Sequence, residues 1–475
     1  MRASKFALTA STALALAGCS MAPDYHRPEV VAAPAYKEGG PWQSAGTNVP
    51  AAGKWWEIFN DPMLSGLEEK IEAGSPSLAA AAARYEQAAA LVRRTRADLF
   101  PEVDVGGNVS RDRVSAGRPL SPGSAATYTN PQIGASLSYE LDLFGRVRNS
   151  VKASEANAQA SESDLAGIRL GLQAQLAAAY FDMRGLDARI VLLRQTVDAY
   201  QRAFDLTDTR HSGGIASGID VSRAQSQLSS AKAELDAVAA DRARDEHAIA
   251  VLIGESPSTF SIPVEDTQLA PPAIPAALPS TLLERRPDIA AAERRVAAAN
   301  AQIGVARAAL FPNITLGASG GFQAASGNLL STASSFWALG PLSAALAIFD
   351  GGARRANVRI SRAQYDEAAA NYRETVLTAF REVEDDLAAG RHLIDQERNQ
   401  REAAAAAERT RDLALTRYRD GAADYLEVTI AQTAALDAER EAIAVRTQRL
   451  QAAVALVRAL GGAAPGDQTP QRPAG

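Results

Sequence analysis

The chain has 475 residues and a formal net charge of −6 at pH 7, which is enough length for two or three ordinary domains. This mild charge, without a basic stripe interleaved with aromatic residues, argues against nucleic-acid binding. Aromatic residues make up 6% of the chain and alanine is abundant, a composition that favours close-packed helices over a large irregular core. With one cysteine, Cys19, the chain has no disulfide framework.

The first residues have the pattern of a targeting segment. A positively charged start precedes the apolar run 6–17, which is too short to span a membrane as a mature helix. The run ends in Leu-Ala-Gly-Cys19, which resembles a bacterial lipoprotein signal. We expect residues 1–18 to be removed and Cys19 to carry a covalent lipid (S-diacylglycerol and N-acyl), although an incidental buried cysteine is the alternative. By resemblance to sorting signals, Ser20 in the next position implies the outer membrane.

A long internal duplication organises the rest of the chain. The segment Ala-Asp-Leu-Phe-Pro at 97–101 returns as Ala-Ala-Leu-Phe-Pro at 308–312, 211 residues later, and further along the offset is 207 residues. A repeat of this length is a duplicated half-domain rather than a short solenoid unit. The predicted organisation is an extended N-terminal segment at 19–60, a first repeat at 61–254, a Pro-rich linker at 255–280, a second repeat at 281–461 and a disordered tail at 462–475.

Each repeat contains two short segments whose apolar residues alternate with period two. We predict β-hairpins at 101–143 and 312–349, with strands of about 10 residues, the length of a tilted strand that crosses a bilayer. A soluble hairpin with one face on a core is the alternative. The polar face of the first hairpin is acidic, which suits a water-filled lumen with a weak preference for cations. Its acids are Glu102, Asp104, Glu140 and Asp142.

Four strands are too few to close a pore in a membrane, since roughly eight is the practical minimum. After residue 19 no run of 18 apolar residues follows, so the mature chain is expected to contain no transmembrane helix. If the chain spans a membrane, strands must do it, and open sheet edges are not tolerated in lipid. Either the hairpins stay in water or several chains each contribute four strands; three chains would give twelve.

A long helix is predicted after each hairpin, over about 147–209 and 353–419. At ~1.5 Å per residue, a helix of ~60 residues is ~90 Å long. Apolar residues of the first helix alternate at spacings of four and three, which is the seam of a coiled coil. They are Leu172, Leu176, Ala179, Met183, Leu186, Ile190, Leu193, Val197, Tyr200 and Phe204. Shorter helices keep a seven-residue repeat, which imposes left-handed supercoiling; one such series is broken by Arg242. A coiled-coil rod without a channel is the alternative interpretation.

Three ordered motifs resemble the TolC-type outer membrane factors, in their OprM-like or NodT-like lipoprotein branch. The first is WWEIFNDPML at 55–64, and the second is LERRPDI at 283–289 with AAERR at 291–295. The third comprises Arg417-Tyr418, Gly421, Tyr425-Leu426 and Ala431-Gln432. The resemblance covers nearly the whole mature chain. It implies a mainly helical fold with membrane strands: a homotrimer whose long coiled-coil helices form an α-barrel below a twelve-stranded transmembrane β-barrel.

The resemblance also implies a function. Such a trimer is the outer membrane exit duct of a tripartite efflux pump, with its helical tube in the periplasm. Its partners would be a periplasmic adaptor protein and an inner-membrane pump of the resistance-nodulation-division type, and its cargo small molecules such as drugs. The outer component of a type I protein secretion system is the alternative within the channel class, and a non-conducting structural lipoprotein is the alternative outside it.

Nothing in the sequence indicates an enzyme. The four histidines lie in unrelated contexts, and nucleophile-elbow, P-loop and zinc-protease motifs are missing from the sequence. We therefore expect no catalytic residue, no metal site and no cofactor other than the lipid on Cys19.

The two turns between long helices, 211–218 and 420–424, are the predicted site of closure of the tube. An acid follows each turn, Asp220 and Glu427; the resemblance implies that both face a constricted aperture, where three chains would bring six carboxylates together. The alternative is helix capping, worth ~0.3–1 kcal/mol. Ile430 occupies a position that is usually acidic in the family, which weakens the case for a second acidic ring and suggests an apolar constriction.

Other residues around the turns are candidates for a gate or for adaptor contact. Arg210 and Arg417 each precede the acid by 10 residues, on the other side of the turn. Tyr418 and the turn glycines Gly214 and Gly421 lie nearby in the sequence. The two arginines are expected either to form ion pairs between neighbouring helices or to contact the adaptor. Solvated arginines on a helix face are the alternative interpretation.

Overall fold

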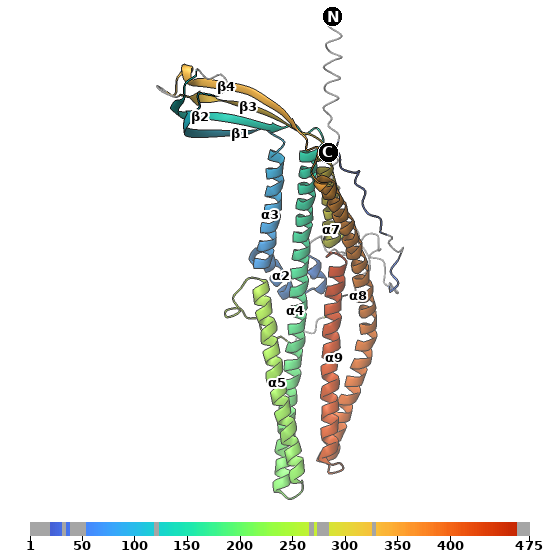
Figure 1. Cartoon of the computed structure of the whole chain (residues 1–475). Coiled ribbons are helices and arrows are strands. Elements are labelled where there is room, and N and C mark those ends of the chain that lie inside the picture. Colours follow the sequence, from blue (N-terminus) through green and yellow to red (C-terminus); the bar gives the residue numbers. More distant parts are fainter. Residues whose placement is uncertain are drawn as a thin grey trace. The chain divides into compact units, whose positions relative to one another are not determined.

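A computed structural model describes most of the chain (Figure 1). The chain divides into two compact units. One unit comprises 1–29, 84–162 and 291–373, and the other comprises 30–83, 163–290 and 374–475. The described residues are 20–30, 35–38, 54–117, 123–265, 270–272, 285–324 and 329–462. The predictions for the signal segment, for Cys19, for parts of the linker and for the tail beyond residue 462 therefore lie outside the described residues.

The strands of both repeats form one antiparallel sheet in the first unit. They are β1 (Glu102–Val114), β2 (Ala126–Glu140), β3 (Asn313–Gln323) and β4 (Ser335–Ala345), in the order β1-β2-β3-β4, as Figure 1 shows. A short 3-10 helix, η2 (Thr332–Ser334), precedes β4. The four predicted strands are confirmed. Because β2 pairs with β3, the duplicated halves are joined through their strands.

Two strand boundaries differ from the prediction. Strands β1 and β2 have 13 and 15 residues instead of about 10 and pair as far as Val114 and Ala126, because backbone pairing continues through polar residues beyond the apolar alternation. Strand β4 ends at Ala345, before the predicted Phe349. The carbonyl of Ala347 accepts a hydrogen bond from Arg354 instead of extending the ladder with β3.

The sheet has one apolar and one polar face. Residues paired directly across strands share a face, which places Val105 of β1 with Trp337 and Leu339 of β4. These three side chains are 78%, 83% and 80% exposed. On the other face, Asp104 of β1 pairs with Ser136 of β2. The apolar face is thus exposed in the single chain.

The helices account for most of the remaining structure. The long helices α4 (Arg146–Ser212) and α8 (Ala353–Arg419) confirm the two predicted ones to within three residues. The others are η1 (Trp55–Phe59), α2 (Pro62–Gly74), α3 (Pro76–Ala97), α5 (Gly218–Leu252), α7 (Pro287–Ala308) and α9 (Tyr425–Ala459). Among the described residues, each helix is too short or too polar to cross a membrane.

In the second unit the predicted seam of α4 is the core. Ile190 and Leu193 pack against Val238 of α5, with Leu436 of α9 beside them. Closer to the turn, Tyr200 packs on Leu228 and Ala231 of α5. This confirms the seam that the spacing of four and three predicts.

Arg242 interrupts the apolar series of α5 because it is a buried member of an ion-pair network. Its guanidinium donates to Asp187 at 2.7 Å and to the carbonyl of Ile262 at 2.6 Å. Asp187 is 0% exposed and also pairs with Arg184 at 3.0 Å. A buried carboxylate needs such partners, so this break in the apolar pattern marks a polar core rather than an exposed face.

Candidate functional site: the paired helix-hairpin tips

Both helical hairpins of the second unit turn with the same backbone geometry. Gly214 and Gly421 have φ values of 75° and 76°, in the left-handed region that favours glycine. The N–H of Gly214 donates to the carbonyl of His211, and that of Ile215 donates to Arg210, both at 2.8 Å. The second tip repeats both bonds around Gly421. This pair of bonds is a Schellman motif, which ends α4 and α8.

A side-chain cap starts the returning helix at each tip. Ser217 caps α5 by accepting from the N–H of Asp220 at 3.2 Å, and the Asp220 carboxylate accepts from the Ser217 N–H at 3.3 Å. This reciprocal pair is a capping box. Asp424 caps α9 by accepting from the N–H of Glu427 at 3.0 Å. Asp220 therefore has the capping role that was the alternative to an aperture role.

Glu427 does not repeat the geometry of Asp220. Its carboxylate pairs with Arg417 of α8 at 2.5 Å, across the turn of the same hairpin. Arg417 also donates to the carbonyl of Ala422 at 3.3 Å. The side chains of this pair are 56% and 42% exposed, so it contributes ~0–1 kcal/mol. The two acids, equivalent in sequence, thus hold different local structures in place.

Arg210 connects the two tips. It donates to the carbonyl oxygens of Tyr418 and Arg419, each at 2.9 Å. Its guanidinium also lies 4.7 Å from the centre of the Tyr418 ring. The last carbonyls of a helix have no partner within the helix; Arg210 satisfies that of Arg419 and gives that of Tyr418 a second donor besides the Gly421 N–H. Among the described residues the predicted ion pair is formed by Arg417 and not by Arg210.

A small aromatic core lies beneath the tips. The rings of Tyr418 and Tyr425 meet edge to face with centres 5.3 Å apart, and they pack with Ala203 and Ala224. Burial raises the pKa of Tyr425 to about 12. Sequence reasoning placed Tyr418 at the site but missed this core; the available signal was a tyrosine one turn before and one turn after Gly421. Ile430 of α9 is 61% exposed.

The four acids predicted for the lumen fall into two kinds. Glu102 and Asp104 are exposed on the polar face of β1. Glu140 accepts two hydrogen bonds from Arg146, at 2.7 and 2.6 Å. Asp142 lies beyond the end of β2 and accepts from the N–H of Arg148 at 2.9 Å, in the first turn of α4. Glu140 and Asp142 therefore join the sheet to α4.

The N-terminal segment of the first unit is held by polar contacts. The hydroxyl of Ser20 donates to Asn149 in the first turn of α4 at 3.0 Å. Tyr25 donates to the carboxylate of Glu293 in α7. The residue that follows Cys19 is thus held beside the start of α4, which directly follows the sheet.

A family model described as outer membrane efflux protein matches residues 67–255 and 278–462. The chain belongs to this family. The efflux protein is 36% identical over 464 residues to the antibiotic efflux pump outer membrane protein ArpC of Pseudomonas putida, covering 95% of this chain and 94% of that protein. It is also 36% identical to the outer membrane protein OprJ of Pseudomonas aeruginosa over 460 residues, covering 95% and 94%.

A solved structure shares the fold of the efflux protein. The outer-membrane channel OprN superposes with a TM-score of 0.87 at 31% identity, covering 94% of this chain and 99% of that one. The resemblance to TolC-type outer membrane factors is thereby confirmed, together with the fold class. The protein is an outer membrane component of an efflux system.

Proposed function

We propose that three copies of this protein form the exit duct of a tripartite efflux pump. The duct passes small molecules, such as drugs, from an inner-membrane pump of the resistance-nodulation-division type through a periplasmic adaptor to the outside. Membership of the family supports the efflux role, and the name of the relative ArpC supports antibiotics as cargo. The protein has no enzymatic activity and no cofactor in this proposal beyond a lipid on Cys19.

The exposed apolar face of the sheet is the observation that carries the proposal. Val105, Trp337 and Leu339 are each more than three-quarters exposed in the single chain, and burying such side chains is favourable by ~1.5–3 kcal/mol each. Lipid would cover this face. The outer edges of β1 and β4 pair with no other described strand, and open edges are costly in lipid. Three copies that pair β4 of one with β1 of the next remove every edge.

The hairpin tips are the proposed gate of this duct. Asp220 and Glu427 follow equivalent turns, and Ile430 stands exposed one turn beyond Glu427. Three chains would bring six carboxylates to the aperture and give it a preference for cations. Single-channel recordings of Asp220→Ala with Glu427→Ala test this role: reduced cation selectivity is expected, and unchanged conductance, selectivity and leak would leave capping as the only role.

Adjacent residues of β1 test the membrane-facing assignment. Val105→Arg puts a charge on the apolar face, which costs up to ~2–4 kcal/mol per copy depending on its depth in the bilayer, and is expected to weaken formation of a heat-resistant trimer and its conductance in lipid vesicles. Asp104→Arg puts the same charge on the polar face, so the trimer should persist with a weaker preference for cations. A Val105→Arg protein that inserts and conducts like the wild type would overturn the proposal.

A further inference from the structure

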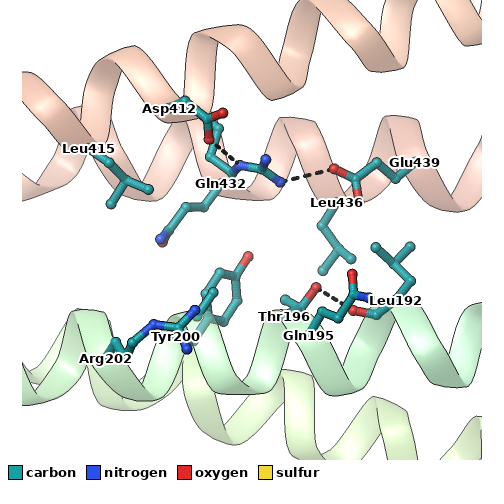
Figure 2. A pocket seen from close by; sticks show the side chains of 12 residues that line it. Leu192, Gln195, Thr196, Tyr200, Arg202, Asp412, Leu415, Gln432, Leu436 and Glu439 are labelled. Atoms are coloured by element: carbon teal, nitrogen blue, oxygen red, sulfur yellow. Dashed lines mark hydrogen bonds and ion pairs between the residues drawn. The ribbon is translucent and has the colours of Figure 1, made fainter.

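A cavity of about 310 Å³ lies between the two helical hairpins of the second unit. Its walls come from α4 of the first repeat and from α8 and α9 of the second (Figure 2). At ~30 Å³ for each water in the liquid, it has room for about ten water molecules. Leu192, Leu415 and Leu436 give it apolar walls.

Two polar groups, from Gln432 and Tyr200, face this cavity. Gln432 is 2% exposed, and its Oε1 has no hydrogen-bond partner among the described residues. Figure 2 shows the Gln432 amide directed from α9 toward Tyr200 of α4. Tyr200 is 6% exposed and its hydroxyl points into the same space. A buried amide oxygen without a donor keeps its full desolvation cost, which a ligand N–H would relieve.

Two carboxylates in the wall of the cavity share one arginine. Arg411 pairs with Asp412 and with Glu439, both at 3.0 Å, and dashed lines in Figure 2 end at these two carboxylates. The fourth charged residue of the lining, Arg202, is exposed. A carboxylate ligand would add a third negative charge beside one half-buried cation that both wall carboxylates already share, so the cavity disfavours an anion.

The duplication shows that helix packing alone does not require this arrangement. The offset of 207 residues matches Gln432 with Gln225, and Tyr200 with Ala407. Gln225 is exposed and its amide donates to Ser229 at 3.1 Å. The second repeat therefore keeps its helix with alanine where the first repeat has Tyr200. The facing pair of Tyr200 and Gln432 is therefore not repeated at the equivalent positions of the duplication.

We propose that the cavity binds a small aromatic molecule whose polar group is a carboxamide rather than a carboxylate. Its N–H donates to Oε1 of Gln432, its carbonyl accepts from the hydroxyl of Tyr200, and its ring packs against Leu192 and Leu436. Because the walls belong to both repeats, the bound molecule would also hold the two hairpins together. This site is separate from the proposed transport of cargo and does not depend on it.

Ligand-observed fluorine NMR on the purified full-length protein tests the site, with 4-fluorobenzamide as the probe. Gln432→Met and Tyr200→Phe each remove one hydrogen bond at nearly constant volume and are expected to weaken binding about tenfold. Gln225→Met is the matched control at the equivalent position of the first repeat, and its affinity should equal that of the wild type. The anionic analogue 4-fluorobenzoate should bind at least about tenfold more weakly.

Thermal unfolding separates a ligand site from a structural one. The probe should raise the unfolding midpoint of the wild type and of Gln225→Met by mass action, but not that of Gln432→Met. Without the probe, Gln432→Met should unfold at the wild-type midpoint or above it, because it removes an unpaired oxygen. If that variant fails to fold, Tyr200→Phe gives the same comparison. Equal binding by wild type and Tyr200→Phe, or equal binding of the amide and benzoate, would overturn the proposal.

Discussion

Arg210 is the residue through which one hairpin tip holds the other. Arg210→Ala removes the donor of the Arg419 carbonyl, the second donor of the Tyr418 carbonyl and the contact with the Tyr418 ring. We expect a loss of ~1–3 kcal/mol in the free energy of unfolding, measured as a lower thermal midpoint. Arg210→Lys should recover part of this loss, since a single ammonium lacks the planar fork that reaches both carbonyls.

Arg417→Ala is the matched control for this prediction. Arg417 occupies the equivalent position in the second repeat, but its pair with Glu427 is exposed and contributes ~0–1 kcal/mol. A midpoint for Arg417→Ala as low as that of Arg210→Ala would contradict the assignment of the inter-hairpin contact to Arg210.

Glu68 of α2 makes stability depend on pH. The side chain is 0% exposed and neither carboxylate oxygen has a hydrogen-bond partner among the described residues. Burial raises its pKa from 4.5 to about 9, so the folded chain holds a proton there that the unfolded chain releases. The contribution of this group to the free energy of unfolding is fully present below pH 4.5 and is lost as the pH rises toward 9. The loss is about 1.4 kcal/mol per pH unit at most.

Glu68→Gln is therefore expected to remove this part of the pH dependence. Between pH 5.5 and pH 8, the thermal midpoint of the wild type should fall more than that of the variant. Glu69→Gln is the control, because the neighbouring Glu69 is exposed and pairs with Lys54. The idea fails if wild type and Glu68→Gln show parallel midpoints across this range.

At the scale of elements, the turn glycines and a helical glycine predict opposite effects of the same substitution. Gly214→Ala and Gly421→Ala each force a side chain into the left-handed region, at ~1–2 kcal/mol. Gly66 lies exposed inside α2 with open space around it, so Gly66→Ala should stabilise the protein by ~0.5–1 kcal/mol. Thermal midpoints measure both effects. A lower midpoint for Gly66→Ala, or an unchanged midpoint for Gly214→Ala, would refute this account.

The elements themselves were predictable from periodicity. The spacing of four and three found α4, and the alternation of period two found all four strands, because these periods follow directly from backbone geometry. The boundaries depended on single side chains that carry no period. Arg354 takes the carbonyl that would extend β4, and Asp142 caps α4 instead of continuing β2.

At the scale of the whole molecule, the sequence predicted the duplication and the family but not the contacts between the repeats. Arg210 was expected in an ion pair because arginine near an acid suggests one, whereas its partners are backbone carbonyls about 200 residues away, which have no sequence signature. The cavity between the hairpins could not be predicted for the same reason. Its lining joins α4 to α8 and α9, and only the pairing of the hairpins brings these residues together.

Cys19 allows one test of how the whole chain is anchored. It is the only cysteine, so a lipid on the N-terminal peptide, detected by mass spectrometry, would have one thiol as its origin. Cys19→Ala should abolish the lipid but keep the heat-resistant trimer, because the apolar face of the sheet supplies the main contact with the membrane. Ser20→Ala removes the bond to Asn149 but keeps the thiol, so lipid should remain. Wild-type protein without lipid would contradict the lipid on Cys19. Loss of the trimer in Cys19→Ala would contradict the assignment of the main membrane contact to the sheet.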